Sequence, residues 1–287
     1  MHTTLISAAE LARHTHDSQW VVLDCRHDLM NPAAGRDAYA AGHIPGARFA
    51  NIDTDLSGAK TGADGVFRGR HPLPERSALL ATLRSWGISD NTQVVAYDAH
   101  GGMFAARLWW LLRWMGHAGV AVLDGGLPAW QALGQPLATD APPALSAAAA
   151  GTLNDRAALV QTVTVEDVLF NLSTQDRIVV DARAADRYRG ENETIDPVGG
   201  HIPHARNRFF KDNLTADGTF KDAAQLRSEF APLFASAAQA IMQCGSGVTA
   251  CHNLLALEVA GMPGAALYPG SWSEWRADPA RPVATGN

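Results

Sequence analysis

The sequence contains an internal duplication, which constrains its fold more than any other feature. Residues 20–26 (WVVLDCR) and residues 177–183 (RIVVDAR) each follow a short segment with helical character and end in Asp-x-Arg. The pattern G-H-I-P-x-A-R then occurs in both halves, at residues 42–48 and 200–206. A repeat at this scale means that one structural unit occurs twice, so both halves should have the same fold.

The correspondence continues through the rest of each half. Residues 94–98 (VVAYD) and residues 241–244 (IMQC) each precede a segment with helical spacing of apolar residues. The expected strands are apolar along their length and alternate with helices, which indicates a mostly parallel sheet covered on both faces. We therefore expect an α/β protein with two domains, residues 1–138 and 161–287, joined at residues 139–160 by a linker rich in proline and alanine.

The loops that follow these matching strands differ between the halves. The first half has Asp98 where the second has Cys244, and Cys244 begins the segment C-G-S-G-V-T. At a strand-to-helix turn, backbone N–H groups and the helix dipole favour a thiolate, which is the reactive form of cysteine. Gly245 and Gly247 carry no Cβ, so the backbone can fold around the sulfur and admit a small anion. We interpret Cys244 as a nucleophile, against the alternative of a buried structural cysteine.

Cys25 is the rival nucleophile. It ends a buried strand and no glycine loop follows it, so we assign it a structural role. The first half is then a catalytically inactive copy that shapes the site. Asp24, Asp181 and the G-H-I-P segments occur in both halves, so we expect them to be scaffold.

Composition argues against several classes of function. A net charge of -6 without any basic block argues against nucleic-acid binding. No apolar run approaches about 18 residues, so we expect no membrane span. Three sparse cysteines and an N-terminus unlike a signal peptide favour a cytoplasmic protein. The eleven histidines include no H-E-x-x-H pattern, so we expect neither a metal nor a cofactor.

These residues resemble the two-domain rhodanese family over nearly the whole chain. The most specific similarities are residues 42–47 (GHIPGA), residues 244–251 (CGSGVTAC) and residues 270–275 (GSWSEW). The resemblance implies two tandem rhodanese-like domains and a persulfide mechanism. In that mechanism Cys244 attacks the outer sulfur of a donor and carries it as Cys–S–SH. A thiol, a reduced thioredoxin-like protein or cyanide then accepts the sulfur.

The resemblance also implies which loop groups bind the donor. The loop is similar to that of the family's 3-mercaptopyruvate sulfurtransferases, whereas thiosulfate-preferring members typically carry basic residues after the cysteine. Backbone amides of residues 245–249 would form an anion cradle, and Ser246 would be the polar partner of a carboxylate donor. The cradle residues expected to contact the substrate are Gly245, Gly247, Val248 and Thr249.

Arg187 takes the position of a substrate-binding arginine of the family, and Arg189 is the nearby fallback. An arginine suits a donor carboxylate because its planar guanidinium can bind both oxygens. The family's second donor arginine usually follows an acidic-Pro pair. Here that place reads Asp196-Pro197-Val198, so the second arginine is missing. The donor preference, 3-mercaptopyruvate or thiosulfate, therefore stays open.

Asp53 and His71 match segments that, together with the loop serine, have been proposed as a proton relay in mercaptopyruvate sulfurtransferases. A histidine oriented by an aspartate could move a proton through Ser246 to the leaving enolate. The alternative is that His71 is a loop histidine without a catalytic role. Arg68 and Arg70 could instead help to attract an anionic donor.

Three other functions fit the sequence less well. A phosphatase on the same fold needs an arginine at the place of Ala250, in a loop one residue longer. A non-catalytic rhodanese-like module for sulfur carriage or binding often lacks the cysteine that is present here. A nucleotide-binding P-loop needs a G-K-[ST] sequence, which does not follow Gly247.

Overall fold

The computed structural model describes residues 1–140, 142, 145–146 and 149–287. This part of the chain divides into two compact units. The first unit consists of Met1–Ser57, Pro74–Leu159 and Ala216–Phe220, and the second of Gly58–Leu73, Val160–Thr215 and Lys221–Asn287. Two short segments thus belong to the unit built mainly from the other half of the sequence. The domain boundaries at residues 138 and 161 stay a prediction.

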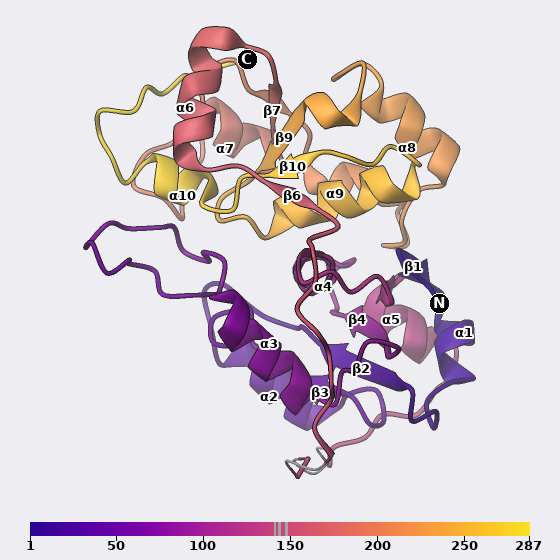
Figure 1. Cartoon of the computed structure of the whole chain (residues 1–287). Coiled ribbons are helices and arrows are strands. Elements are labelled where there is room, and N and C mark those ends of the chain that lie inside the picture. Colours follow the sequence, from indigo (N-terminus) through magenta and orange to yellow (C-terminus); the bar gives the residue numbers. More distant parts are fainter. Residues whose placement is uncertain (141, 143–144, 147–148) are drawn as a thin grey trace. The chain divides into compact units, whose positions relative to one another are not determined.

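The first unit contains a five-stranded sheet in the order β1-β5-β4-β2-β3, in which all neighbouring strands are parallel (Figure 1). The strands are β1 (Leu5–Ile6), β2 (Trp20–Asp24), β3 (Arg48–Phe49), β4 (Gln93–Tyr97) and β5 (Val120–Leu123). The helices are α1 (Ala8–Ala12), α2 (Ala34–Ala41), α3 (Arg76–Ser85), α4 (Ala105–Trp114) and α5 (Gly126–Ala132).

The second unit repeats this topology. Its sheet has the order β6-β10-β9-β7-β8, again with parallel neighbours throughout. The strands are β6 (Gln161–Thr162), β7 (Ile178–Asp181), β8 (Arg206–Asn207), β9 (Ala240–Gln243) and β10 (Ala266–Leu267). The helices are α6 (Val165–Thr174), α7 (Ala185–Arg189), α8 (Ala223–Phe230), α9 (Thr249–Val259) and α10 (Ser271–Trp275), with short 3₁₀ turns at η2 (Phe210–Asn213) and η3 (Ala237–Gln239).

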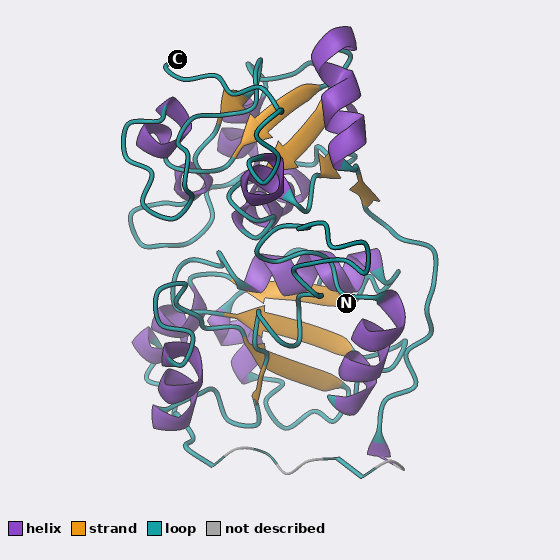
Figure 2. Ribbon diagram, turned by 90° about the vertical axis from the view of Figure 1, so that its left-hand side faces the viewer, coloured by secondary structure: helices purple, strands orange, loops and turns teal. Residues whose placement is uncertain are grey.

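Both sheets are flanked by helices, as Figure 2 shows for each unit. Every residue of β4 and β9 is buried, because helices cover both faces of these central strands. The predicted α/β fold with two parallel-sheet units is therefore confirmed. Within the described residues, no helix combines the length and the apolar character needed to cross a membrane.

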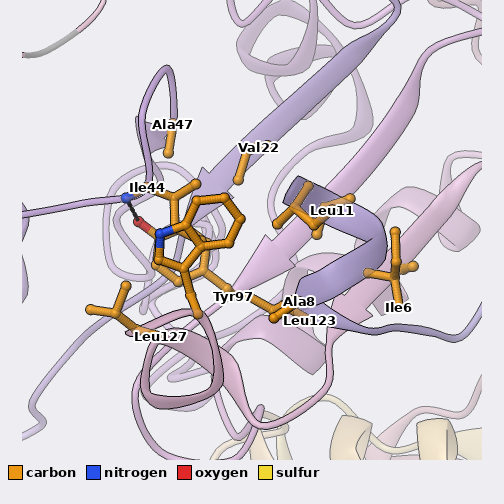
Figure 3. Close-up of a cluster of buried hydrophobic side chains, with 12 residues drawn as sticks. Ile6, Ala8, Leu11, Val22, Ile44, Ala47, Tyr97, Leu123 and Leu127 are labelled. Carbon is orange, nitrogen blue, oxygen red and sulfur yellow. Dashed lines mark hydrogen bonds between the residues drawn. The ribbon is translucent and has the colours of Figure 1, made fainter. Parts of the chain in front are cut away.

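The core of the first unit packs side chains from the sheet and from the G-H-I-P segment against Trp130 and Leu127 (Figure 3). Tyr97, at the end of β4, joins these parts, because its hydroxyl accepts the backbone N–H of Ile44 at 3.2 Å and donates to Asp24 at 2.7 Å. The apolar core thereby fixes the end of the central strand, from which the variable loop begins.

The Asp-x-Arg motif forms the same buried ion pair in both units. Arg26 binds Asp24 and donates to the carbonyl of Gly42, while Arg183 binds Asp181 and donates to the carbonyl of Gly200, both carbonyl contacts at 2.7 Å. Arginine stays charged when it is buried, so a buried guanidinium needs partners of this kind to offset the loss of hydration. The motif therefore ties β2 and β7, the neighbours of the central strands, to the G-H-I-P segments, as a scaffold element should.

The later part of the predicted linker is attached to the first unit. Gly151 donates to the carbonyl of Arg84 at 2.8 Å, and Asn154 donates to Asp90 through both its backbone and its side chain. A Cβ on Gly151 would collide with the carbonyl of Ile88, so only glycine permits this approach. Parts of the proline and alanine runs used to predict the linker, residues 141, 143–144 and 147–148, lie outside the described residues.

Candidate functional site

Cys244 lies directly after β9, in the turn that leads into α9, and its side chain is buried with 2% of its surface exposed. Helix α10 holds this turn from the other side. Ser271 Oγ accepts the backbone N–H of Cys244 at 3.1 Å, and the N–H groups of Trp272 and Ser273 donate to the carbonyls of Cys244 and Gly245 at 3.0 and 2.9 Å. The G-S-W-S-E-W segment therefore fixes the loop backbone on both sides of the sulfur.

Glycine at position 247 is required by this packing. Its φ angle is +75°, in the left-handed region, and a Cβ there would collide with the carbonyl oxygen of Pro269. Cys251, on the first turn of α9, donates from its sulfur to the carbonyl of Gly247 at 3.3 Å. The loop can therefore turn tightly around Cys244.

Several backbone N–H groups of the loop have no acceptor in the described part of the chain. Among the described residues, no hydrogen-bond acceptor meets the backbone N–H groups of Gly245, Ser246, Val248 or Thr249. These residues form the loop and the beginning of α9, an 11-residue helix whose N-terminal end carries positive partial charge. The loop thus offers donors to an anion at the place where the sequence predicted a cradle.

Arg187 projects from α7 and ends beside the loop. Its Nε and Nη2 donate to Glu193 at 2.8–3.1 Å, and Nη2 also donates to Asp196 at 3.3 Å. A Cβ placed on Gly245 would lie 3.8 Å from Arg187 Nη2 and 4.0 Å from Nη1. The structure therefore brings Arg187 next to the residue that follows the nucleophile.

Glu193 is ionised in this setting. Burial alone would raise its pKa, but hydrogen bonds from Arg187 and from the backbone N–H groups of Ile195 and Asp196 outweigh burial and lower the pKa. Glu193 also lies 3.4 Å from Arg183, the arginine of the scaffold motif. The carboxylate thus connects the scaffold ion pair to the arginine at the loop.

Arg70, which the sequence offered only as a residue that might attract a donor, lies still closer to the loop. Its Nη1 binds Asp196, whose side chain is only 4% exposed, and its backbone N–H donates to Ser273 Oγ at 3.1 Å. A Cβ on Gly245 would lie 2.8 Å from Arg70 Nη2. The sequence gives one weak signal for this placement, which is that Arg70 precedes His71.

His71 and Ser246 form the contact that the proposed relay requires. His71 Nδ1 lies 2.8 Å from Ser246 Oγ, and both side chains are buried. Asp53 belongs to the first unit, where its carboxylate lies 3.8 Å from Nε2 of His27. The structure thus brings His71 and Ser246 together, and a proton relay through them, with or without Asp53, stays a prediction.

The remaining candidate residues from the sequence are Arg189, Arg68 and Cys25. Arg189 pairs with Glu191 at 2.7–2.8 Å, and Arg68 pairs with Asp64. Cys25 is buried, and burial together with nearby carboxylates, Asp24 first, raises the pKa of its thiol well above the ordinary value. A thiol that stays protonated is a poor nucleophile, which agrees with a structural role for Cys25.

A comparison with known protein families identifies the family of this chain. The family model of the rhodanese-like domain matches residues 7–133 and 164–278. The chain belongs to the rhodanese family. Both copies of the domain are thus present, and the family membership inferred from the loop and the duplicated motifs is confirmed.

Two relatives match this chain over 92–99% of its length. A protein named "Probable 3-mercaptopyruvate sulfurtransferase" from Pseudomonas aeruginosa is 46% identical over 286 residues, which cover 99% of this chain and 98% of that protein. Thiosulfate sulfurtransferase of Mus musculus is 36% identical over 273 residues, covering 92% of this chain and 88% of that protein.

A solved structure agrees with these relatives. The 3-mercaptopyruvate sulfurtransferase from Leishmania major has a TM-score of 0.83 and 29% identity, and the match covers 95% of this chain and 74% of that one. These comparisons support the prediction of a sulfurtransferase, and they do not support the alternative of a non-catalytic rhodanese-like module.

Proposed function

We propose that this protein transfers a sulfane sulfur from 3-mercaptopyruvate to a thiol or to cyanide through a persulfide on Cys244. The observation that carries this proposal is the loop itself. A buried cysteine at a strand-to-helix turn is followed by backbone N–H groups without acceptors in the described residues, and two guanidinium groups lie beside the next residue. This arrangement suits a thiolate, a persulfide anion and an anionic donor alike.

In the first half-reaction, the Cys244 thiolate attacks the sulfur of 3-mercaptopyruvate. A sulfur–sulfur bond forms and the carbon–sulfur bond of the donor breaks, so its electron pair passes to the carbon and gives pyruvate enolate. The His71–Ser246 pair, joined by a 2.8 Å hydrogen bond, is placed to deliver the proton that converts the enolate to pyruvate. Cys244 is left as a persulfide.

In the second half-reaction, the thiolate of an acceptor attacks the outer sulfur of the persulfide. The sulfur–sulfur bond of the enzyme breaks, the acceptor leaves with the transferred sulfur, and the Cys244 thiolate is regenerated. A small thiol or a reduced thioredoxin-like protein fits this step, and cyanide would leave as thiocyanate. These acceptors, and a cytoplasmic location, form part of the proposal.

Thiosulfate is the second candidate donor, and the mouse relative named for it favours this alternative. The loop itself favours 3-mercaptopyruvate, because Gly245 and Ser246 are neutral where a basic side chain would suit a doubly charged donor. Kinetics with the two donors side by side decide between them. A kcat/KM at least about tenfold higher for thiosulfate would reverse the assignment of the donor.

The persulfide itself can be detected by mass spectrometry. Treatment with 3-mercaptopyruvate in the absence of an acceptor should add one sulfur atom to the peptide that contains Cys244, and a later addition of thiol should remove it. The Cys244→Ala variant should show neither the mass gain nor sulfur transfer, whereas Cys25→Ser should show both. Sulfur transfer by Cys244→Ala would disprove the mechanism.

A further inference from the structure

The second unit has a pocket of about 340 Å³ that neither Cys244 nor Ser246 lines. Its walls come from the beginnings of α6 and α10, from the chain just after β6 and β10, and from Pro72 and Leu73. Strand β10 lies next to β9, the strand that Cys244 follows. The pocket therefore lies at the carboxyl edge of the parallel sheet, where open α/β sheets bind their ligands, and its size suits a small molecule.

The carboxylate of Glu274 is buried in the wall of this pocket. The residue is only 7% exposed, and among the described residues no N–H group donates to its side-chain oxygens. A Cβ on Gly270 would collide with Oε2 of Glu274, so the carboxylate folds back over a glycine that also lines the pocket. Burial raises the pKa of Glu274, because a carboxylate without N–H donors loses its hydration and gains little in return.

The hydroxyl of Tyr268 belongs to the same wall. Tyr268 is fully buried, and within the described part of the chain no contact of its hydroxyl has ordinary hydrogen-bond geometry. Burial, followed by the charge of Glu274, raises the pKa of Tyr268 well above the ordinary value, so the hydroxyl stays neutral. Two buried side chains thus bring a carboxylate and a hydroxyl oxygen to one pocket, and both oxygen types accept hydrogen bonds.

The arginines that act on Glu274 through space are bound elsewhere. Arg281 and Arg68 both lower the pKa of Glu274, but neither forms an ion pair with its carboxylate among the described residues. Arg281 donates to the backbone carbonyl of Glu274 at 2.6 Å, and Arg68 binds Asp64. The buried negative charge therefore has no cation in direct contact, which favours a cationic ligand.

The remaining walls of the pocket are mainly apolar. The beginning of α6 would add positive partial charge, but Glu166 and Asp167 lie in its first turn and offset it. A ligand with an uncharged apolar body can therefore pack against the walls, which include Pro72, Leu73, Val163, Val165 and Pro269.

We propose that this pocket is a second binding site, for a small primary amine in its ammonium form on an apolar body. The carboxylate of Glu274 and the hydroxyl of Tyr268 bind the ammonium group, which has three N–H donors and a positive charge. This proposal does not depend on the sulfur-transfer reaction. Pro269 lines the pocket and also packs against Gly247, so the ligand binds next to the nucleophile loop.

Isothermal titration calorimetry of the full chain near neutral pH tests the proposal with three probes of similar shape. Benzylamine is a cation, benzyl alcohol is neutral and benzoate is an anion. Benzylamine should bind with a Kd of about 1 mM or tighter, as expected for a ligand of this size. Benzyl alcohol should bind at least about tenfold more weakly, because the charge-assisted hydrogen bonds are lost, and benzoate should bind more weakly still.

Variants of the two polar side chains locate the site. Glu274→Gln removes the charge at nearly constant size and should weaken benzylamine binding by about tenfold or more. Tyr268→Phe should weaken it less, by about threefold. Glu191→Gln is the matched control, because Glu191 is an exposed acidic residue of the same unit that pairs with Arg189. It should leave the Kd for benzylamine within about twofold of wild type.

Thr162→Lys replaces Glu274→Gln if that variant fails to fold. Thr162 is an exposed residue of β6 that lines the pocket, so the lysine ammonium should compete with benzylamine and weaken its binding. Several outcomes would overturn the proposal. These are no measurable binding of benzylamine, equal or tighter binding of benzyl alcohol or benzoate, and a Kd for benzylamine that the pocket variants leave unchanged.

Discussion

The loop after β4 and the loop after β9 occupy the same place in two copies of one fold. They differ in whether the loop contains an anionic side chain that accepts its backbone N–H groups. In the first unit, the side chain of Asp98 binds the backbone of the loop that it begins. Its carboxylate accepts backbone N–H groups at 2.8–3.0 Å from His100, Gly102, Phe104 and Ala105. In the second unit the corresponding residue is Cys244, and N–H groups of the loop have no acceptor in the described residues.

This difference separates the requirements of folding from those of catalysis. A strand-to-helix turn of this fold brings backbone N–H groups together in a catalytic unit and in an inactive one alike. The first unit satisfies them with a built-in carboxylate, which stabilises the loop and closes it to other anions. Under the proposed function the second unit leaves them for a sulfur anion and a donor, so we expect its loop to be the less stable of the two and the reactive one.

The largest effect is expected when the second loop is made to resemble the first. We expect Cys244→Asp to abolish sulfur transfer by more than about 10³-fold, because the nucleophile is gone. The new carboxylate should accept the unused N–H groups, so the thermal midpoint should be equal to or higher than that of Cys244→Ala. A midpoint well below that of Cys244→Ala would show that the loop does not favour an anion at this position.

The next largest effect is expected in the first loop. Asp98→Ala leaves four N–H groups without their acceptor, three of them buried, and we expect the free energy of unfolding of the first unit to fall by about 3 kcal/mol or more. Asp98→Asn, which keeps one acceptor oxygen, should lose less. Denaturant titration of the full chain measures both, and the persulfide yield of the folded enzyme should be unchanged.

The proton relay should give a smaller effect, on rate alone. Ser246→Ala and His71→Gln should each lower kcat for 3-mercaptopyruvate about tenfold, and the double variant should be little worse because the two residues act as one unit. Asp53→Asn tests the third member. If it leaves kcat unchanged, the relay consists of His71 and Ser246 only. Strictly additive losses in the double variant would contradict a shared role.

The smallest expected effect concerns acid stability. Burial lowers the pKa of His117 below the ordinary value of 6.5, so the unfolded chain binds a proton at a higher pH than the folded one. The stability due to neutral His117 is present above pH 6.5 and is lost as the pH falls toward the lowered pKa. The second unit has Met262 at the matching turn, where both residues donate backbone N–H to the preceding helix.

The His117→Met substitution places at this turn the residue type that the second unit has at Met262. It should reduce the acid-induced loss of stability by about 1 kcal/mol or less. Unfolding free energies at pH 7.5 and pH 5.5 check this, with the exposed His204→Met as the control. A pH dependence identical to that of the wild type would mean that another group controls the acid sensitivity.

The sequence pattern predicted those parts of the site whose residues are close together in the chain. Strand β9, the turn at Cys244 and helix α9 are contiguous, so apolar periodicity and two glycines were sufficient to place them. The duplication then separated the scaffold ion pairs from the loop that differs. Repetition is visible in the sequence because each copy must satisfy the same packing.

The contacts of Arg70 and His71 could not be predicted in the same way. Arg70 and Asp196 are 126 positions apart, and His71 and Ser246 are 175 positions apart. Nothing in the composition of residues 58–73 indicates that this segment belongs to the second unit. Such contacts depend on the closure of long loops, which leaves no periodic signal. Only the family resemblance pointed to His71, and it gave no role to Asp196.

The alternating series of charges Asp181, Arg183, Glu193, Arg187, Asp196 and Arg70 has a consequence for how this protein can change over evolution. Each inner member neutralises two neighbours, so replacing one by a neutral residue leaves others buried without a counter-charge. Substitutions along the series should therefore be tolerated in pairs rather than singly. A scaffold residue such as Asp181 and a residue beside the loop such as Arg70 would then be inherited together, although no atom of one touches the other.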